Sequence, residues 1–553
     1  MPIAGFWSEW WAGALGLAAA MAGLIAVRGR SLILPLVLLV PAVLLLTLLL
    51  QFGLGRLVFP QLGLLYAVYL LWAGVLMVLG RYLVETTGLV RLADVIASAL
   101  LLGALVGAGI ALAQWLGVAR GAGWIFPKLG GTVYANLGQA NHHAQYSWLG
   151  IASLFYLCSR RYLSRPWLWI LILLIAFGSV LSGSRSVFVY PLVLLAAIGW
   201  LKFRRPQGPE VRLWADAVLL LPAVIALSIF AAWATSHIPD ASGAAVSGSR
   251  LYESVSGSST RLEIARSAWA AFLEHPWLGQ GVGNYAWASF VAASSYVGDE
   301  PFGVAENAHN FILHLMTEFG APATGAVILL LGIWARCFLG KPWGLEQFWC
   351  GAVLGIGLVH ALLEYPLWYS YFLGPTALLL GAADRGGTIT LAGRRLTVYL
   401  VLAALGGGLI LANLRSDYIK IEAASNFPLA AHPDRERAWR ISMDRLVKLH
   451  HESLLSPWVL LAFTNLAEPS KLQAQDRADL CERGIHFAPA RLLVARCAMQ
   501  QALAGRDQDA RALTLAVLRA FPAQRSATVD ELAKGAREFP EIAPLWELSL
   551  GKY

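Results

Sequence analysis

VIASALLLGALVGAGIALAQWLG, residues 95–117, is a run of 23 residues without a single charged side chain. An α-helix needs about 20 mainly apolar residues to cross the ~30 Å hydrocarbon core of a bilayer. This run therefore predicts a membrane-spanning helix. Eleven further runs predict the same, namely 11–27, 32–50, 61–80, 141–158, 166–183, 187–203, 213–235, 310–335, 347–363, 367–383 and 396–413.

The composition of the whole chain agrees with these runs. Of its 553 residues, 58% are hydrophobic and 14% are charged, and the mean hydropathy is +0.61. These values lie outside the range of soluble globular proteins and are typical of polytopic membrane proteins. We expect an all-α protein, with a bundle of about 12 transmembrane helices and a helical domain at the C-terminal end.

The connections between the predicted helices differ in charge. One set holds 16 basic residues, namely Arg28, Arg30, Arg81, Arg91, Arg160, Arg161, Arg165, Lys202, Arg204, Arg205, Arg212, Arg336, Lys341, Arg385, Arg394 and Arg395, whereas the opposite set holds 7. The positive-inside rule places the basic set in the cytoplasm. The opposite set then faces the periplasm of a bacterial inner membrane. The formal net charge of +9 follows largely from this topology, so it does not indicate a nucleic-acid partner.

The chain changes character at Arg415. The last 139 residues carry 36 charged side chains, against 39 in the preceding 414 residues. We therefore expect two domains: residues 1–414 form the membrane part, with a large external loop at 236–308, and residues 415–553 form a soluble helical domain in the periplasm. Residues 492–518 predict two helices joined by a Gly-Arg-Asp turn, as in tetratricopeptide-like pairs, although no repeat of fixed period is present.

The five cysteines and the N-terminus allow narrower statements. Cys158, Cys337 and Cys350 fall in or beside predicted membrane helices, where a buried thiol is the ordinary expectation. Cys481 and Cys497 lie on two adjacent predicted helices in an oxidising compartment, so both a disulfide and two free thiols stay open. The first eleven residues have no basic n-region and no cleavage site, so we expect no signal peptide.

Four polar clusters fall on the face that the charge pattern places outside. The first is Asn136–His143, at the entry of a predicted helix. Its amides and imidazoles supply oriented donors and acceptors for a polar ligand, and we expect Gln139, Asn141 and His142 to bind substrate. A helix cap with interfacial packing is the alternative.

The second and third clusters carry cations. Arg185 lies in the turn Ser182-Gly-Ser-Arg-Ser186, where small neighbours give an anion access to the guanidinium and to backbone N–H groups; the alternative is an arginine that only marks the interface. Arg261 opens a helix-like run in the large loop. The glycines at 279–283 that follow do not form a dinucleotide site, since no strand precedes them and no acidic residue follows at the required distance. We interpret them as a turn toward the bilayer.

The fourth cluster contains a titratable side chain at a membrane boundary. His309 lies between Asn307 and Asn310, and the corner Glu364-Tyr365-Pro366-Leu367-Trp368 follows a later predicted helix. A histidine is well suited as a base near neutral pH. We therefore predict His309 as catalytic and Asn307, Asn310, Glu364, Tyr365 and Trp368 as substrate-binding. The external loops lack the paired acidic residues that a hard cation requires, so we expect no metal.

At these residues the chain resembles the bacterial O-antigen ligase superfamily, and in particular the PglL-type protein O-oligosaccharyltransferases. The similarity rests on five stretches: Leu137-Gly-Gln-Ala-Asn-His142, Gly183-Ser-Arg185, Arg261 to Gly283, Glu306-Asn-Ala-His309-Asn310 and His360-Ala-Leu-Leu-Glu-Tyr-Pro-Leu-Trp-Tyr369. It covers residues 120 to 385 firmly and the C-terminal part loosely. Relatives usually have one more hydrophobic segment ahead of an element like Trp7-Ser-Glu9-Trp10, which here lies almost at the start.

The resemblance implies a GT-C-like membrane fold and a reaction. A preassembled glycan would move from undecaprenyl diphosphate to Ser or Thr of a periplasmic protein such as a pilin, with inversion and without a cofactor. Arg185 and Arg261 would bind the leaving diphosphate, and His309 would take the proton of the acceptor hydroxyl. Glu364 would hold a cation or set the tautomer of the histidine.

Three alternatives stay open. A ligase that transfers the glycan to lipid A core, or a polymerase of repeat units, would use the same histidine and arginines with another acceptor. A transporter of lipid-linked glycans would also need cations that face a cavity. A scaffold would use the C-terminal helices to recruit secretion or pilus components.

Overall fold

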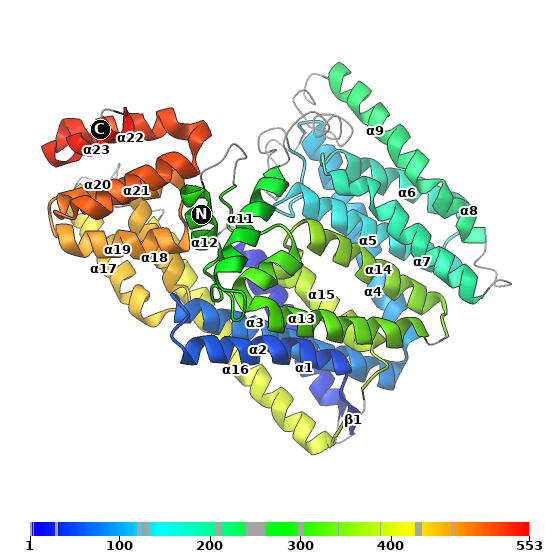
Figure 1. Cartoon of the computed structure of the whole chain (residues 1–553). Helices are drawn as coiled ribbons and strands as arrows, with labels where there is room; N and C mark the ends of the chain where they lie inside the picture. The colour runs from blue at the N-terminus through cyan, green and yellow to red at the C-terminus, as the bar shows by residue number, and fades with distance from the viewer. Residues whose placement is uncertain are drawn as a thin grey trace.

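The structure is a computed structural model, and it describes residues 3, 5–27, 31–118, 124–126, 128, 132–205, 212–238, 260–296, 303–340, 342–387, 389–425, 434–466 and 468–551. Nearly all of these residues are helical (Figure 1). The described strands are β1 (Leu32–Ile33) and β2 (Thr390–Leu391), which pair antiparallel with Leu32 opposite Leu391. Arg28, Arg30 and Lys341 of the charge pattern lie outside the described residues, as does the whole segment 239–259.

Each predicted membrane run coincides with helix. The elements are α1 (Phe6–Val27), α2 (Leu39–Gly53), α3 (Pro60–Thr87), α4 (Leu89–Trp115), α5 (Ala140–Ser159), α6 (Arg165–Val180), α7 (Tyr190–Arg204), α8 (Arg212–Val218), α9 (Leu220–His237), α13 (Phe311–Gly340), α14 (Leu345–Leu363), α15 (Ser370–Ala383) and α16 (Gly393–Ser425). Among the described residues, eight helices are long and apolar enough to cross a membrane, and α6 and α15 are shorter apolar helices. The protein is a helical membrane protein, as predicted, whereas the number of twelve crossings stays a prediction.

One predicted run differs at its start. The run 32–50 begins with β1, and helix starts only with the short 3-10 turn Leu36–Leu38 before α2. Pro35 precedes this turn with an extended backbone. A proline lacks the N–H that a helix interior requires, so the apolar run could not be helical throughout.

The core of the bundle surrounds α5. This helix is buried along almost its whole length and packs against α4, α6 and α14. Glycines allow such close approach: a Cβ at Gly150 would overlap the Ala104 side chain, and a Cβ at Gly381 of α15 would overlap the Met77 carbonyl of α3. Small residues are the usual means by which membrane helices come into contact.

In the described part of the predicted large loop lie two helices, α11 (Thr260–Glu274) and α12 (Tyr285–Ser295). The turn between them packs on a kink in α13, where Gly320 has a φ of 80°. Gln280 N donates to Thr317 O at 2.8 Å, and Ala321 N donates to Pro276 O at 2.8 Å. The glycines of this turn therefore serve close backbone contact. The turn leads into α12, and the return of the chain to the bilayer at these glycines stays a prediction.

The C-terminal part is a stack of helices, drawn from orange to red in Figure 1. It comprises α17 (Arg435–Glu452), α18 (Ser456–Leu466), α19 (Ala474–Phe487), α20 (Arg491–Leu503), α21 (Asp507–Ala520), α22 (Arg525–Glu538) and α23 (Ala543–Ser549). Helices α20 and α21 are the predicted pair, with Gly505 at φ 73° in their turn. Residue 414 lies inside α16, which continues to Ser425, so the change in composition occurs within one helix.

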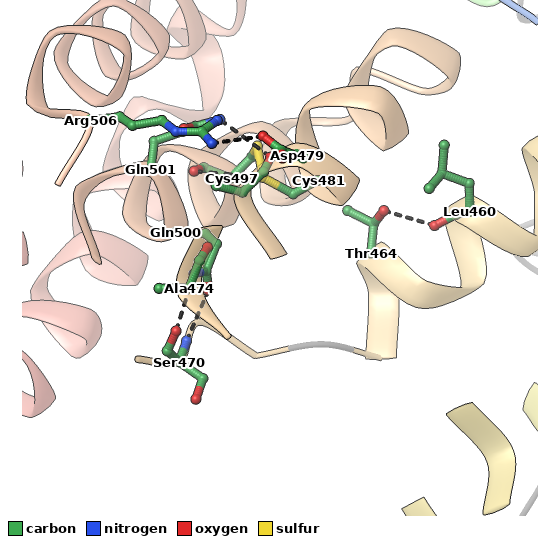
Figure 2. Close-up of a disulfide and its surroundings, with 11 residues drawn as sticks. Leu460, Thr464, Ser470, Ala474, Asp479, Cys481, Cys497, Gln500, Gln501 and Arg506 are labelled. Carbon is green, nitrogen blue, oxygen red and sulfur yellow. Dashed lines mark hydrogen bonds and ion pairs between the residues drawn. A yellow bond between two sulfur atoms is a disulfide. The ribbon is translucent and has the colours of Figure 1, made fainter. Parts of the chain in front are cut away.

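A disulfide joins Cys481 on α19 to Cys497 on α20, with their Cα atoms 5.4 Å apart (Figure 2). Both cysteines belong to an apolar cluster that also contains Phe290 and Ala293 of α12. On the same junction the Trp287 and His486 rings stack at 3.9 Å. The C-terminal helices are therefore packed directly on the loop helices of the membrane part.

Candidate functional site

Four distant segments meet around one carboxylate at one end of the bundle, which we call the site end. Glu364 follows the last residue of α14, and its side chain is only 5% exposed. Its Oε1 accepts hydrogen bonds from Asn141 Nδ2 and from Arg261 Nη2, both at 2.8 Å. Its Oε2 lies 2.6 Å from His309 Nδ1. The structure thus brings together four of the residues that the sequence predicted.

His309 is held in an unusual backbone conformation. Its φ is 50°, in the left-handed region that residues other than glycine seldom adopt. This conformation occurs in the short segment before α13, and the side chain keeps 25% exposure. With Nδ1 directed at Glu364, the carboxylate favours the tautomer in which Nδ1 carries the proton and Nε2 is free to accept one.

The carboxylate between these groups is ionised. Burial alone would raise the pKa of Glu364, but hydrogen bonds and positive charge from His309 and Arg261 outweigh it and lower the pKa to about 2. At neutral pH this carboxylate is therefore a permanent acceptor, which can orient an imidazole and stabilise its protonated form.

Arg261 keeps most of its hydrogen-bonding capacity. It lies in the first turn of α11, and its side chain is 34% exposed. A guanidinium has five N–H donors, and one of them bonds Glu364. The remaining donors can bind an anion beside His309.

Arg185 makes no contact with this cluster among the described residues. It begins the 3-10 turn Arg185–Phe188, which packs against α5, the helix that carries Asn141. Among the residues that the structure describes, Arg185 has no hydrogen bond or ion pair, and its side chain is exposed.

The remaining predicted residues divide into two kinds. Asn310 has a structural role, because its Nδ2 donates to Leu362 O at 3.0 Å and its Oδ1 accepts from Leu313 N at 3.0 Å. Trp368 donates from Nε1 to Tyr66 OH at 2.9 Å, which ties the corner after α14 to α3. These contacts do not involve a reacting group.

The other predicted residues line the site or its cavity, or have a buried polar atom without a hydrogen bond to any described residue. Gln139 caps α5, and its Oε1 is buried without a hydrogen bond to any described residue. The His142 ring is buried, with Nδ1 at 3.1 Å from Tyr371 OH. Asn307 lines a cavity, and the Tyr365 ring meets the His309 ring edge-on with centroids 5.1 Å apart.

Sequence reasoning missed several polar neighbours. His360 Nδ1 lies 2.5 Å from Gln145 Oε1, and the His360 ring centroid is 5.7 Å from that of His142. The helical spacing offered a signal: Gln145 follows His142 by three residues and His360 precedes Glu364 by four, so each pair shares one face of its helix.

A second missed cluster contains an acidic residue of α1. Glu9 Oε2 accepts from Ser370 N at 2.7 Å and from Tyr69 OH at 3.2 Å. It joins α1 to α3 and α15. The element Trp7-Ser-Glu9-Trp10 was noted in the sequence, but the contacts of Glu9 could not be inferred from it, since its partners are 60 and 361 residues away.

A cavity of about 1770 Å³ adjoins the cluster through Tyr365, whose ring packs edge-on against that of His309. Asn307, Tyr365 and Trp368 line its polar part, and it continues between apolar side chains of α1, α3, α7, α13, α14 and α16. Trp458 and Phe487 of the C-terminal helices line it as well. The cavity therefore connects the site end, the interior of the bundle and the C-terminal helices.

Two family models match the chain. The model described as "O-Antigen ligase" matches residues 170–328, and the model described as "Virulence factor membrane-bound polymerase, C-terminal" matches residues 348–534. The first range contains Arg185, Arg261 and His309, and the second contains Glu364. The ion-paired cluster is therefore assembled from both matched regions.

Curated relatives point in the same direction. A "General O-oligosaccharyltransferase" of Acinetobacter baylyi is 28% identical over 340 residues, which are 60% of this chain and 58% of the relative. A "ComP-specific O-oligosaccharyltransferase" of the same organism is 28% identical over 296 residues, 49% of this chain and 48% of the relative. The matched regions thus span about half the length of these relatives. From the family matches and these similarities, we conclude that the chain is similar to the bacterial O-antigen ligases and, among them, resembles the PglL-type O-oligosaccharyltransferases.

Proposed function

We propose that this protein is an O-linked oligosaccharyltransferase that moves a preassembled glycan from undecaprenyl diphosphate to Ser or Thr of periplasmic proteins, pilins among them. The observation that carries the proposal is the triple contact at Glu364, which places a histidine and an arginine on the same carboxylate. A transfer of this kind needs a base for the acceptor and a cation for the leaving group. The two needs are met within one cluster.

In the proposed reaction His309 is the general base. Its Nε2 takes the proton of the acceptor hydroxyl while the acceptor oxygen attacks the anomeric carbon. The bond from that carbon to the diphosphate oxygen breaks, and its electron pair leaves with undecaprenyl diphosphate. Glu364 stabilises the imidazolium that forms, and direct displacement inverts the anomeric centre.

The proposed diphosphate site consists of Arg261 and Arg185. Negative charge develops on the departing diphosphate, so fixed cations stabilise the transition state more than the ground state. Arg261 offers its unused N–H donors, and Arg185 lies exposed in the neighbouring turn. In this proposal no metal ion takes part, and Gln139, Asn141, His142 and Tyr365 orient the sugar or the phosphate.

The cavity supports two further parts of the proposal. Its apolar interior has the chemistry to hold the polyprenyl chain of the donor. Its boundary at Trp458 and Phe487 is formed by the C-terminal helices, and we assign the approach of the acceptor to this side. We place the site end and these helices in the periplasm of the bacterial inner membrane, on the basis of the charge pattern.

The test is reconstitution. Purified protein in nanodiscs would receive a polyprenyl-diphosphate-linked oligosaccharide and a periplasmic protein acceptor, and the products would be analysed by peptide mass spectrometry. We expect a glycan mass on a Ser or Thr peptide, with loss of the product in the His309→Ala variant. Product on lipid A core alone would exclude a protein acceptor.

The second candidate is a glycan ligase or polymerase with a lipid-linked acceptor. The names of both matching families favour it, since one names an O-antigen ligase and the other a polymerase. Both reactions would use the same base and cations. The reconstitution separates them, because lipid A core and a second donor molecule can be offered in place of the protein.

A further inference from the structure

Helix α11, which carries Arg261, is attached at both ends to the ends of membrane helices. At its start, Arg261 bonds Glu364, the residue after α14. Just after its end, Leu278 O accepts a 2.7 Å hydrogen bond from Gln51, which lies two residues before the end of α2. Its 15 residues extend about 22 Å between these two attachments. Both attachments are at the site end of the bundle.

The lengths of α13 and α14 indicate where these attachments lie relative to the membrane. The start of α13 lies beside the end of α14, since Asn310 bonds Leu362. The end of α13 lies close to the start of α14, because only four residues separate Gly340 from Leu345. At 1.5 Å per residue α14 is about 28 Å long, whereas the 30 residues of α13 amount to about 45 Å. The 20 residues of α13 after the kink at Gly320 match α14 at about 30 Å. The segment of α13 before the kink is therefore not needed to cross the membrane. Helix α11 packs against this segment.

The outer face of α11 carries an apolar stripe. Large side chains recur at one helical face and just beyond it: Leu262 is 51% exposed, Trp269 48%, Leu273 57% and Trp277 75%. Charged side chains accompany the stripe, since Arg266 lies within it and Glu263 and Glu274 lie along one side. A helix with an apolar stripe bordered by charged side chains is suited to a membrane interface.

We propose that α11 lies in the membrane interface at the site end, with this outer stripe in contact with lipid. The lipid-facing surface next to the stripe supports this occupant: at the end of α2, beside the Gln51 contact, Phe52 is 58% and Leu54 62% exposed. Tryptophan is enriched at the boundary between hydrocarbon and headgroups. An apolar stripe that is continuous with such a surface fits a bilayer. Contact with lipid also requires no specific alignment of side chains along the helix.

The position of α11 has a consequence for Arg261. A helix that lies at headgroup depth holds its first-turn arginine where the diphosphate of a membrane lipid resides. This consequence rests on the proposed function, whereas the lipid contact itself does not. Arg261 would then be positioned by two elements, the Glu364 carboxylate and the lipid-bound stripe.

The test measures the environment of the stripe directly. In the full chain, the half-buried Cys158 and Cys337 are replaced by serine, Leu273→Cys is introduced, and a nitroxide is attached in nanodiscs that contain anionic lipid. Two matched controls carry the label at other exposed leucines: Leu405→Cys on membrane helix α16 and Leu472→Cys in the C-terminal part. We expect Leu273 to resemble Leu405, with high access to oxygen and low access to a water-soluble nickel chelate.

Other outcomes overturn the proposal. Access to nickel equal to that of Leu472 would place the stripe in water. Low access to both reagents would show that protein covers it, either a second copy or another part of the chain. If Leu273→Cys does not fold, Trp269→Cys gives the same readout.

The functional consequence has its own measurement. Leu273→Ser with Trp277→Ser should lower kcat for the lipid donor roughly tenfold while KM stays within about twofold, as expected when an interaction with the departing diphosphate is lost in the transition state. An unchanged kcat would overturn the positioning of Arg261 by the membrane. Because the nitroxide measurement does not depend on activity, a protein without transferase activity would still test the lipid contact.

Discussion

His309 combines two features that seldom occur together by chance. Its backbone is in the left-handed region, and its Nδ1 faces an ionised, buried carboxylate. Left-handed backbone costs about 1–2 kcal/mol for a residue with a Cβ. Strain of this kind persists where the surrounding structure enforces it, and it concentrates at functional sites.

We expect His309→Ala to lower kcat for glycan transfer by at least about 100-fold, because a positioned base contributes roughly that factor or more. Binding of the lipid donor should change little, since the arginines remain. Donor binding and single-turnover transfer measured on the same preparation check both statements. His275→Ala is the matched control, an exposed histidine of the same loop that contacts Arg56. Full transfer by His309→Ala would remove the base from the mechanism.

The second prediction at this scale concerns pH and Glu364. The pKa of this carboxyl is lowered from 4.5 to about 2 in the folded protein, so its contacts stabilise the fold fully above pH ~4.5 and are lost as pH falls toward 2. The linked free energy is on the order of 3 kcal/mol. Melting curves of the wild type and Glu364→Gln should therefore differ by a constant amount between pH 8 and 5.5 and converge on further acidification. Curves that stay parallel down to pH 3 would contradict the shift.

At the scale of elements, the lock between the α11–α12 turn and α13 has a clear energetic basis. Gly279 has a φ of 72°, and a Cβ there would overlap the Glu318 carbonyl. Glu318 Oε1 also accepts from Gly283 N at 2.9 Å, and Gln51 Nε2 donates to Glu318 O at 2.7 Å. The turn and the kink therefore stabilise each other.

Gly279→Ala should destabilise the protein by about 2 kcal/mol or more, because it adds left-handed strain to a backbone clash. Gly325→Ala in α13 is the matched control. Nothing lies within 4 Å of a Cβ at Gly325, and replacing a helical glycine by alanine is neutral or stabilising by up to about 1 kcal/mol. Melting temperatures of both variants in the same detergent test the contrast. Equal melting temperatures would show that the turn adapts to a side chain.

For the whole molecule, the disulfide and the aromatic junction join the C-terminal helices to the membrane part. Cys481 and Cys497 belong to the cluster that includes Phe290 of α12, and α12 packs against α11. Breaking the disulfide can therefore affect the helix that carries Arg261 through direct packing contacts.

Replacing both Cys481 and Cys497 by serine should lower the stability of the C-terminal helices by about 3 kcal/mol, the usual effect of opening a loop of roughly 15 residues. Reductant should lower the melting temperature of the wild type to that of the variant and leave the variant unchanged. Cys158→Ser, which removes a free thiol, serves as the control. A variant as stable as the oxidised wild type would show that the bond adds nothing to this packing.

The cavity leads to a prediction about the acceptor. Phe487 lies at the cavity boundary, where its ring packs with Phe59 of the membrane part and with Trp458. Phe487→Ala should raise KM for a protein acceptor severalfold while hydrolysis of the donor proceeds at the wild-type rate, because truncation of a buried aromatic contact costs about 1–3 kcal/mol of binding. Parallel assays of transfer and hydrolysis test this, and an equal loss in both would assign Phe487 to folding.

The sequence by itself determined that this protein lies in a lipid bilayer and which reactive side chains it carries at the membrane boundary. Runs such as 95–117 must be helical in a bilayer, since every backbone group there needs an internal partner, and this holds whatever the neighbours are. The residues His309, Arg261, Asn141 and Glu364 were recognisable because polar side chains at a membrane boundary stand out from an apolar background. The family resemblance suggested that Glu364 contacts a cation or the histidine, but no local pattern encodes which arginine it meets or that Asn141 joins it.

Only the tertiary structure decided which of the polar residues share a site. Glu364 meets partners 55, 103 and 223 residues away in sequence, and such pairings depend on how helices cross and kink. The same packing gives the predicted residues different roles. Asn310 and Trp368 hold helices together, whereas His309 and Arg261 keep polar groups available for a ligand. It also decided the pairing of Cys481 with Cys497, because a disulfide requires proximity that helix spacing alone does not provide.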